Sequence, residues 1–306
     1  MRDRAKASRP VEANPPEGSE TSSVRWSQER RLQFIDFRLQ WEGRINRKDV
    51  TDFFKISVPQ ASADIARYAE LAPGNLQYDN SSRTYVATPT FLPQFESSGP
   101  RQYLSQLLAL ERNILARDQV FLSFRPPMAT VPLPSRTIDS KILSVMLRAI
   151  AEGAKLPIRY QSIARDEAQE RYISPHAFGH DGMRWHVRAY CHIREGFRDF
   201  IFGRILSAGQ PIASDIDPAS DREWNTNVDL VLMPDETLTP SQRHGVEIDY
   251  GMKGGRVMIT CRQAMLFYTL RTLNFELNGL PRKGERQIVI ANLADVRPLL
   301  PKPGQA

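Results

Sequence analysis

The chain has 306 residues, of which 41% are hydrophobic and 25% are charged, which is typical of a globular protein with room for two or three domains. Its apolar runs are far shorter than the roughly 20 residues that a transmembrane helix needs, and its first residues lack the apolar core of a signal peptide. Two cysteines exclude a disulfide framework, and the net charge of +6 is compatible with a polyanionic partner. We therefore expect a protein of the cytoplasm, associated with the nucleoid if that partner is DNA.

The start of the chain predicts a disordered leader followed by a small helical domain, residues 25–92. Residues 1–24 are polar, rich in Pro and Ser and without periodicity, so we expect them to be disordered. Ser27 is a potential N-cap for an amphipathic helix that ends near Gly43. A second, short helix follows over about 47–55.

A third helix is the best defined of the set. Ser57 can cap it, Pro59 fits its first turn, and Pro73-Gly74 ends it. Its apolar residues recur at helical spacing and predict one buried stripe, formed by Ala61, Ile65, Tyr68 and Ala72. Residues 76–87 then predict two short strands around a turn at 79–82. Three helices followed by a hairpin are the order of a winged helix-turn-helix.

Polar residues on the third helix and at the tip of the hairpin are the candidate DNA contacts. Gln60 can pair with adenine through two hydrogen bonds, and hydroxyl and guanidinium groups can reach bases or phosphates. The candidates are Ser57, Gln60, Ser62, Arg67, Asn80 and Arg83. Residues 26–89 carry nine Lys and Arg against eight Asp and Glu, which is little positive charge for a groove-binding domain. A helical protein-interaction module is therefore the alternative interpretation.

Two Pro-rich stretches separate this domain from the rest of the chain. Between them residues 101–118 predict a strong helix, and we assign residues 93–136 to a helical linker that contributes to dimerisation. Residues 137–212 predict a helix, 139–152, and a small barrel of short antiparallel strands. The predicted strands are 157–163, 169–178, 184–191 and 197–206. Residues 224–306 mix strands and helices and predict a dimerising α+β module, so the fold class is α+β multidomain.

One barrel strand, within GMRWHVRAYCHIREGFRDF (182–200), has an unusual polar side. Alternation predicts a core face of Trp185, Val187, Ala189 and Cys191 and a second face of His186, Arg188, Tyr190 and His192. Six arginines but three acids lie from Arg171 to Arg204, and arginine pairs bidentately with phosphate. A phosphate-bearing ligand is therefore the leading interpretation. The alternative is a solvated sheet face with ion pairs to three carboxylates, Asp181, Glu195 and Asp199.

Metal binding and catalysis find little support in the sequence. Four of the five histidines lie within 176–192, but no Cys pair, HExxH motif or carboxylate pattern supplies further zinc ligands. Neither a nucleophile elbow nor a glycine-rich phosphate loop is present, and Cys191 and Cys261 follow apolar alternation. We predict no metal site, no cofactor and no enzymatic activity, with a nucleic-acid-processing enzyme as an alternative.

Several segments resemble the WYL transcriptional regulators. The run RWHVRAYCHIREGFRDFIFGRI is similar to the core of the WYL domain, with Trp185-His186-Val187 where the family often has Trp-Tyr-Leu, and PIRYQS and YISPHAF fit the same domain. SVPQASADIARY and NLQYDNSSRTYVAT resemble the winged helix of these regulators. The last module resembles their C-terminal extension, and the order of parts looks most like repressors that guard phage-defence operons such as BREX and CBASS.

The resemblance implies a homodimeric repressor on an inverted-repeat operator, with an Sm-like/SH3-like barrel that senses a nucleotide or single-stranded nucleic acid. On that analogy Ser162, Trp185, His186, Arg188, Arg198 and Arg204 line the sensor site, and the arginine cluster adds Arg171 and the strand adds Tyr190. His186 and Val187 depart from the signature, which bears on the ligand. Ser62 and Ala63 stand where related regulators often have Arg, which points to a different operator. An activator of the same build, whose ligand promotes DNA binding, is the alternative.

Overall fold

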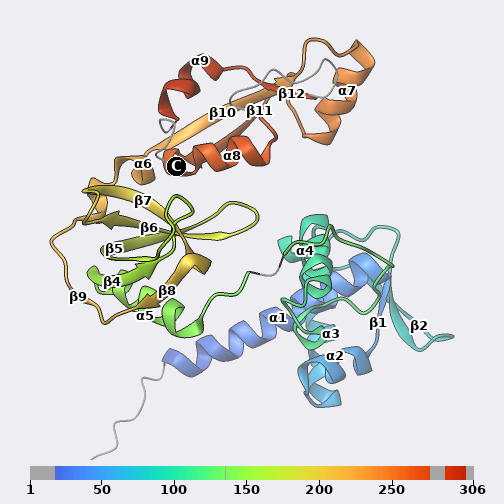
Figure 1. Ribbon diagram of the computed structural model, residues 1–306. Helices are drawn as coiled ribbons and strands as arrows, with labels where there is room; N and C mark the ends of the chain where they lie inside the picture. The colour runs from blue at the N-terminus through green and yellow to red at the C-terminus, as the bar shows by residue number, and fades with distance from the viewer. Residues whose placement is uncertain (1–17, 135, 276–286, 301–306) are drawn as a thin grey trace, which may run out of the picture. The chain divides into compact units, whose positions relative to one another are not determined.

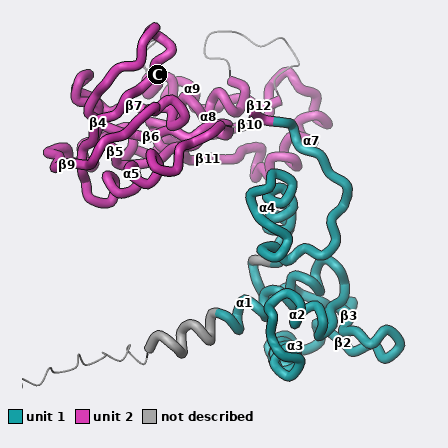
Figure 2. Tube along the Cα trace, turned by 60° about the horizontal axis from the view of Figure 1, so that its bottom comes forward, with its two compact units in different colours: residues 1–132 teal, residues 133–306 magenta. Residues whose placement is uncertain are grey.

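The computed structural model describes residues 18–134, 136–275 and 287–300. The chain divides into two compact units, residues 1–132 and residues 133–306 (Figure 2). The first unit has one hydrophobic core and the second has two. Among the described helices, none is long and apolar enough to cross a membrane.

The first unit begins with three helices and a three-stranded antiparallel sheet (Figure 1). These elements are α1 (Gly18–Glu42), β1 (Arg44–Ile45), α2 (Arg47–Phe54), α3 (Val58–Leu71), β2 (Leu76–Asp79) and β3 (Thr84–Ala87). The strands pair in the order β1-β3-β2, so the hairpin of β2 and β3 is joined by the short strand between α1 and α2. The predicted winged helix-turn-helix fold is confirmed.

Helix α1 begins earlier than the sequence predicted. The expected N-cap at Ser27 is wrong, because the helix already starts at Gly18, and the expected leader therefore overlaps it over 18–24. No Gly or Pro interrupts residues 19–42, so no helix-breaking residue separates Gly18 from the predicted part of the helix. Its first turns carry no apolar stripe, which is why periodicity did not reveal them. Residues 1–17 lie outside the described residues.

The core of the first unit joins the three helices to a segment beyond the wing. The predicted stripe of α3 is fully buried, with Ala61, Ile65, Tyr68 and Ala72 at 0–4% exposure. The ring of Phe34 stacks on Phe53 at 4.6 Å and meets Phe121 edge-on at 5.4 Å. Phe121 comes after the linker helix, so residues well beyond position 92 help to close this core.

The linker contains η1 (Glu96–Ser98), α4 (Pro100–Glu111) and η2 (Arg117–Gln119). The helix predicted over 101–118 is therefore too long. It ends at Glu111 because Asn113 adopts a left-handed backbone (φ 54°), a conformation that no helix continues through. Several large apolar side chains in this region are exposed, namely Leu104, Ile114, Phe124 and Val131.

The second unit begins with α5 (Ser140–Ala151), whose N-cap is Asp139, and a six-stranded antiparallel sheet. The strands are β4 (Ala154–Tyr160), β5 (Gln169–His180), β6 (Trp185–Cys191), β7 (Gly196–Ile201), β8 (Ile205–Ala208) and β9 (Ile212–Ala213). They pair in the order β7-β6-β5-β4-β8, with β9 also on β4. Among the described residues β7 and β8 do not pair with each other, so the sheet of the predicted barrel is open between them.

Two details of this sheet differ from the sequence expectation. The strand predicted over 197–206 is divided by a short turn, η3 (Phe202–Arg204). This turn connects β7, at one edge of the sheet, to β8, at the opposite edge. β5 also contains a bulge between Pro175 and Ala177. One side of the sheet packs on α5, and the shared core includes Met146, Leu156, Ile173, Val187 and Phe200.

The last module is a three-stranded antiparallel sheet covered by helices. It comprises β10 (Asn227–Pro234), α7 (Pro240–Asp249), β11 (Val257–Arg262), α8 (Leu266–Thr272), β12 (Ile288–Ile290) and α9 (Leu293–Val296), with turns η5 (Gln263–Met265) and η6 (Arg297–Leu299). The strand order is β11-β10-β12. η4 (Pro218–Ser220) and α6 (Arg222–Asn225) lead into it. The predicted α+β composition is confirmed.

Candidate nucleic-acid interface and anion cavity

The N-terminal turn of α3 presents Gln60 to solvent. Ser57 caps the helix, its Oγ accepting from the backbone N–H of Gln60 at 3.4 Å. Ser62 is half-buried, and its Oγ donates to the carbonyl of Val58 at 3.0 Å. Arg67 is exposed and pairs with Glu70 at 2.9 Å, an exposed contact of little strength that a phosphate could replace. Of the expected contacts on α3, Gln60 and Arg67 are therefore the most accessible.

The side chain of Gln60 contacts a buried ion pair that the sequence did not reveal. Its Nε2 donates to Oδ1 of Asp64 at 3.2 Å. Asp64 is completely buried in α3 and accepts from Nε of Arg31 at 2.6 Å and from Nη2 at 3.3 Å. Arg31 comes from α1, so this contact joins the first helix to the exposed end of the third.

The tip of the β2–β3 hairpin is exposed and organised by one aspartate. Asn80 and Arg83 are both exposed, and Arg83 has a left-handed backbone (φ 53°). Asp79 accepts from the hydroxyls of Ser82 and Ser81 at 2.6 and 2.7 Å and from the Ser81 N–H. These hydrogen bonds lower the pKa of Asp79 to about 2. The expected wing contacts are thus placed on a well-defined turn.

A second buried carboxylate, Asp36 of α1, ties the linker to the back of α3. It accepts from the hydroxyl of Tyr68, from Ser98 Oγ at 2.6 Å and from the backbone N–H groups of Gln94 and Phe95 at 3.1–3.2 Å. Burial and the hydrogen bond to Asp36 raise the pKa of Tyr68. The sequence did not predict this contact, because the residues that form it lie up to 62 positions apart.

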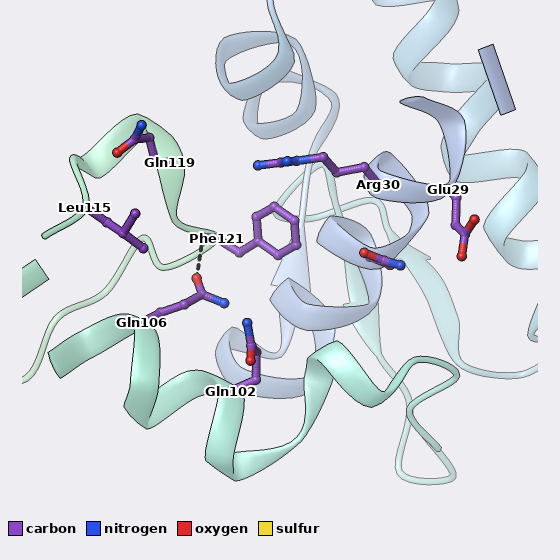
Figure 3. Close-up of a pocket in the computed structure, with 8 residues that line it drawn as sticks. Glu29, Arg30, Gln102, Gln106, Leu115, Gln119 and Phe121 are labelled. Atoms are coloured by element: carbon purple, nitrogen blue, oxygen red, sulfur yellow. Dashed lines mark hydrogen bonds between the residues drawn. The ribbon is translucent and has the colours of Figure 1, made fainter. Parts of the chain in front are cut away.

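The first unit also contains a cavity of about 320 Å³ beside α1 and α4 (Figure 3). It is lined by Glu29, Arg30, Gln33, Gln102, Gln106, Leu115, Gln119 and Phe121. Gln106 Oε1 accepts from the backbone N–H of Phe121 at 2.7 Å, drawn as the dashed line in Figure 3. The glutamine side chains make this a polar hollow, and none of the predicted site residues lines it.

A larger cavity of about 920 Å³ lies in the second unit, along the edge strand β7. Six of the eight expected ligand residues line it, namely Ser162, Arg171, His186, Arg188, Arg198 and Arg204. The other two lie outside its lining. Trp185 is 49% exposed and packs on His180, and the expectation that it faces the core is wrong, because it stands at the first position of β6 beside a turn. Tyr190 packs against Phe197 and His192.

Strand register separates these arginines onto two sides of the sheet. Cross-strand partners share a face, and Arg171 pairs with Ile158 while Arg198 pairs with Ala189, both core residues. Arg188 pairs with Asp199 on the opposite face. The cavity borders both faces because β7 is an edge strand. Arg188 therefore lies on the face predicted for it, whereas Arg171 and Arg198 lie on the core side of the sheet.

The core-facing end of the cavity is cationic and aromatic. The guanidinium of Arg171 lies over the rings of Tyr160 and Phe200, 5.5 and 5.9 Å from their centroids, and Tyr160 Oη accepts from the Ile201 N–H at 3.2 Å. The Nε atoms of Arg171 and Arg198 are buried without a hydrogen-bond partner. None of the salt bridges among the described residues involves Arg171, Arg198 or Arg204. Buried donors without partners are costly, so an anion bound here would supply acceptors for these N–H groups.

The opposite end is closed by carboxylates around Arg188, which is 4% exposed. Its guanidinium donates to Asp221 at 2.7 and 2.9 Å, to Glu223 at 2.8 Å and to Asp199 at 3.3 Å. Burial opposes ionisation of Asp221, but hydrogen bonds from Arg188 and His176 outweigh it and hold the pKa of Asp221 below its usual range. Arg188, which the sequence predicted to bind a ligand, is thus engaged by carboxylates of the chain itself, one of which is the Asp199 named in the alternative interpretation.

His186 is buried in the same region, at 3% exposure. Its Nε2 lies 3.0 Å from Oδ2 of Asp181, its ring packs on Tyr268 at 4.7 Å, and its Nδ1 has no partner. Burial works to raise the pKa of Asp181, but the hydrogen bonds from His186 and two backbone N–H groups lower it to about 2. Within the described residues no group of three or more His, Cys, Asp or Glu side chains is placed to hold a metal ion.

Sequence reasoning missed the aromatic walls and the contribution of the last module. Tyr160 and Phe200 were interpretable only as core residues, although their rings also line the cavity. Gln263 and Tyr268 enter the lining from η5 and α8, and Tyr268 donates to Asp199 at 3.2 Å. No local sequence pattern could predict their presence in the lining, because they belong to the last module of the chain.

Three family models match the chain in sequence order. Residues 27–109 match the BrxR transcriptional regulator winged helix-turn-helix domain, and residues 141–209 match the WYL domain. Residues 227–296 match the BrxR transcriptional regulator C-terminal dimerization domain. Together the matches account for most of the described residues.

Curated relatives are similar over almost their whole length. The DNA-binding transcriptional repressor CapW of Stenotrophomonas maltophilia is 46% identical over 285 residues, which cover 92% of this chain and 95% of the relative. The protein of the same name from Pseudomonas aeruginosa is 44% identical, covering 94% and 98%. That from Escherichia coli is 41% identical, covering 90% and 93%.

Proposed function

The chain belongs to the family of WYL-domain transcriptional regulators that includes the CapW repressors, and from this membership we propose that it is a DNA-binding transcriptional repressor. Its winged helix would bind operator DNA and its last module would hold a homodimer. We propose further that the operator is an inverted repeat and that the controlled genes form a phage-defence operon.

Placement of a few side chains supports the DNA-binding part. The first turn of a recognition helix is where base contacts are usually made, and in α3 this turn carries the exposed Gln60. Ser57 would support DNA binding by capping α3, and Ser62 by its hydrogen bond to the backbone of the first helical turn. Arg67, Asn80 and Arg83 would contact phosphates or the adjacent groove. Two such helices in a dimer would enter grooves one helical turn, or a multiple of it, apart.

We propose the domain limits that the sequence suggested, with one adjustment. We place the sensor domain at 137–212, the dimerising module at 224–306 and the linker within 93–136. For the winged-helix domain we propose an end beyond residue 92, because Phe121 packs in its core and the family match extends to residue 109.

The ligand-sensing part depends on one observation, that Arg171 and Arg198 line the cavity and that the Nε atom of each is buried without a hydrogen-bond partner. Arg204 and Ser162 line the same cavity. A nucleotide or a short single-stranded nucleic acid would bring phosphates to these donors and a base to the rings of Tyr160 and Phe200. Such an effector controls DNA binding only by favouring one of two dimer states over the other.

Fluorescence anisotropy with the labelled promoter DNA upstream of the neighbouring operon tests the proposal. We expect a saturable, salt-sensitive complex that exceeds the affinity for random DNA of the same length, and a dimer in sedimentation. Adding a short single-stranded oligonucleotide or a cyclic nucleotide should release the promoter. Tighter binding on addition would instead identify an activator, and cleavage of labelled DNA in the presence of Mg²⁺ would identify an enzyme.

A further inference from the structure

Gln60 is exposed, yet the orientation of its side-chain amide is decided by its buried neighbour. Nε2 of Gln60 lies 3.2 Å from Oδ1 of Asp64, one helical turn along α3. Asp64 is completely buried. The pair therefore consists of one group open to a ligand and one group that no ligand can reach.

Only one orientation of the amide satisfies this contact. A carboxylate accepts hydrogen bonds and has none to donate, so the Gln60 NH2 must face Asp64. Rotating the amide by 180° would bring two oxygens together at hydrogen-bond distance and leave a buried acceptor unsatisfied. The hydrogen-bond network thus assigns the amide orientation, and Oε1 of Gln60 points away from Asp64.

Arg31 keeps the carboxylate in place. It donates to both oxygens of Asp64, at 2.6 and 3.3 Å, and it retains its charge at every physiological pH. Arg31 side-chain exposure is 11% and that of Asp64 is 0%. The acceptor that orients Gln60 is therefore pinned between two helices and does not turn to suit a DNA base.

We propose that Asp64, held by Arg31, makes Gln60 specific for a base that carries a donor in the major groove and excludes guanine. This inference rests on the proposed base contact of Gln60. The outward Oε1 accepts from N6 of adenine while the second N–H of Nε2 donates to N7, or Oε1 accepts from N4 of cytosine. Guanine presents two acceptors, N7 and O6, and its O6 would face Oε1 of Gln60.

Replacing Asp64 by Asn should reverse the preference. Arg31 would claim the single oxygen of the new amide at the 2.6 Å position, leaving the new NH2 toward Gln60. Gln60 would then turn its oxygen inward and its NH2 outward, and two outward N–H groups suit N7 and O6 of guanine. Asp64 is in this sense a positioning residue that touches no DNA.

Selection from a randomised double-stranded DNA library with the full-length chain tests this inference. The proteins compared are the wild type, Gln60→Ala, Asp64→Asn and Glu70→Gln. Glu70→Gln is the matched control, because it also removes one negative charge from α3 but lies at an exposed position paired with Arg67. We expect the wild type to prefer adenine or cytosine over guanine by about 10-fold or more at one position per half-site.

Each outcome is decisive. Gln60→Ala should erase the preference at that position, Asp64→Asn should shift it toward guanine by several-fold, and Glu70→Gln should leave it unchanged. If Gln60→Ala changes no position, the base contact fails and the inference fails with it. If Gln60→Ala erases the preference but folded Asp64→Asn keeps it, the orientation mechanism alone is overturned.

The wild type covers the case in which Asp64→Asn does not fold. At the position whose preference Gln60→Ala erases, the assigned orientation of the Gln60 amide predicts adenine or cytosine. A wild-type preference for guanine at that position would contradict the assigned orientation. A merely structural role of Asp64 would lower affinity at all positions and would not change one base preference.

Discussion

Arg188 of β6 donates from Nε and Nη2 to the two carboxylate oxygens of Asp221, at 2.7 and 2.9 Å, and so joins the WYL sheet to the N-cap of α6. Both side chains are at most 5% exposed. The same guanidinium reaches Asp199 and Glu223, and Asp199 accepts from Tyr268 of α8. A residue expected to await a ligand is therefore the centre of the contact between two parts of the second unit.

Removing Arg188 should destabilise the second unit strongly. Arg188→Ala leaves the buried carboxylate of Asp221 without its cation, and breaking a buried pair from one side costs about 3–5 kcal/mol. Chemical denaturation followed by tryptophan fluorescence measures the loss. Arg262→Ala, which removes an exposed guanidinium lying over Trp224, is the matched control and should cost far less. If Arg188→Ala left the free energy of unfolding and DNA binding unchanged, Arg188 would instead be a ligand-binding residue.

Substitution of Arg171 and Arg198 should have a smaller effect on stability than substitution of Arg188. Arg171→Gln and Arg198→Gln each remove an Nε atom that is buried without a hydrogen-bond partner and break no salt bridge within the described part of the chain, so we expect little loss of stability. The same variants should weaken binding of a labelled single-stranded oligonucleotide at least several-fold and should still bind the promoter. Binding of the oligonucleotide at the wild-type level would place the effector elsewhere.

Gln60→Ala should weaken promoter binding by about 1–3 kcal/mol if it removes one base-specific contact, and should change binding to random DNA much less. Arg67→Ala should reduce both affinities together and lower the salt dependence, because it would remove a phosphate contact. Anisotropy titrations at two salt concentrations distinguish the two patterns. Equal losses on both DNAs for Gln60→Ala would show a backbone contact.

Acid should destabilise the second unit, because Asp181 and Asp221 lose their charge-assisted hydrogen bonds to His186 and Arg188 when they are protonated. The pKa of Asp181 is lowered to about 2 and that of Asp221 is lowered further below its usual range. A carboxyl group with a depressed folded-state pKa stabilises the fold above its unfolded pKa near 4, and this contribution is lost as the pH falls through the folded value. The free energy of unfolding should therefore fall between about pH 4 and pH 2. Asp181→Asn should make that fall less steep in urea titrations.

The Asp36 contact should be required to hold the linker against the winged helix. Asp36→Ala would leave Ser98 Oγ and two backbone N–H groups of the first unit without an acceptor. We expect the free energy of unfolding to fall by about 1–3 kcal/mol because of these unsatisfied donors. Hydrogen exchange of the Gln94 and Phe95 amides should become faster. Asp52→Ala, at an exposed position of α2, is the control and should change neither.

Much of the local structure was determined by the sequence alone. Ser57, Pro59 and Pro73-Gly74 set the limits of α3 because capping, first-turn proline and helix termination act over a few residues. Alternation found β6 and assigned Val187 and Ala189 to the core. The resemblance of the motifs to the WYL regulators also needed no coordinates, and the family matches agree with it.

Only the tertiary structure decided what the polar side chains face. Alternation shows which residues of one strand share a side, but the side shared between strands depends on pairing register and on the bulge in β5 at Pro175 and Ala177. That register separates Arg171 and Arg198 from Arg188. Burial of Arg188 comes from Asp221, 33 positions away, and the lock on Gln60 comes from Arg31 of another helix. Contacts between distant residues leave no pattern in local spacing. The sequence therefore identified the candidate cations, but only the fold shows which of them are already paired within the protein.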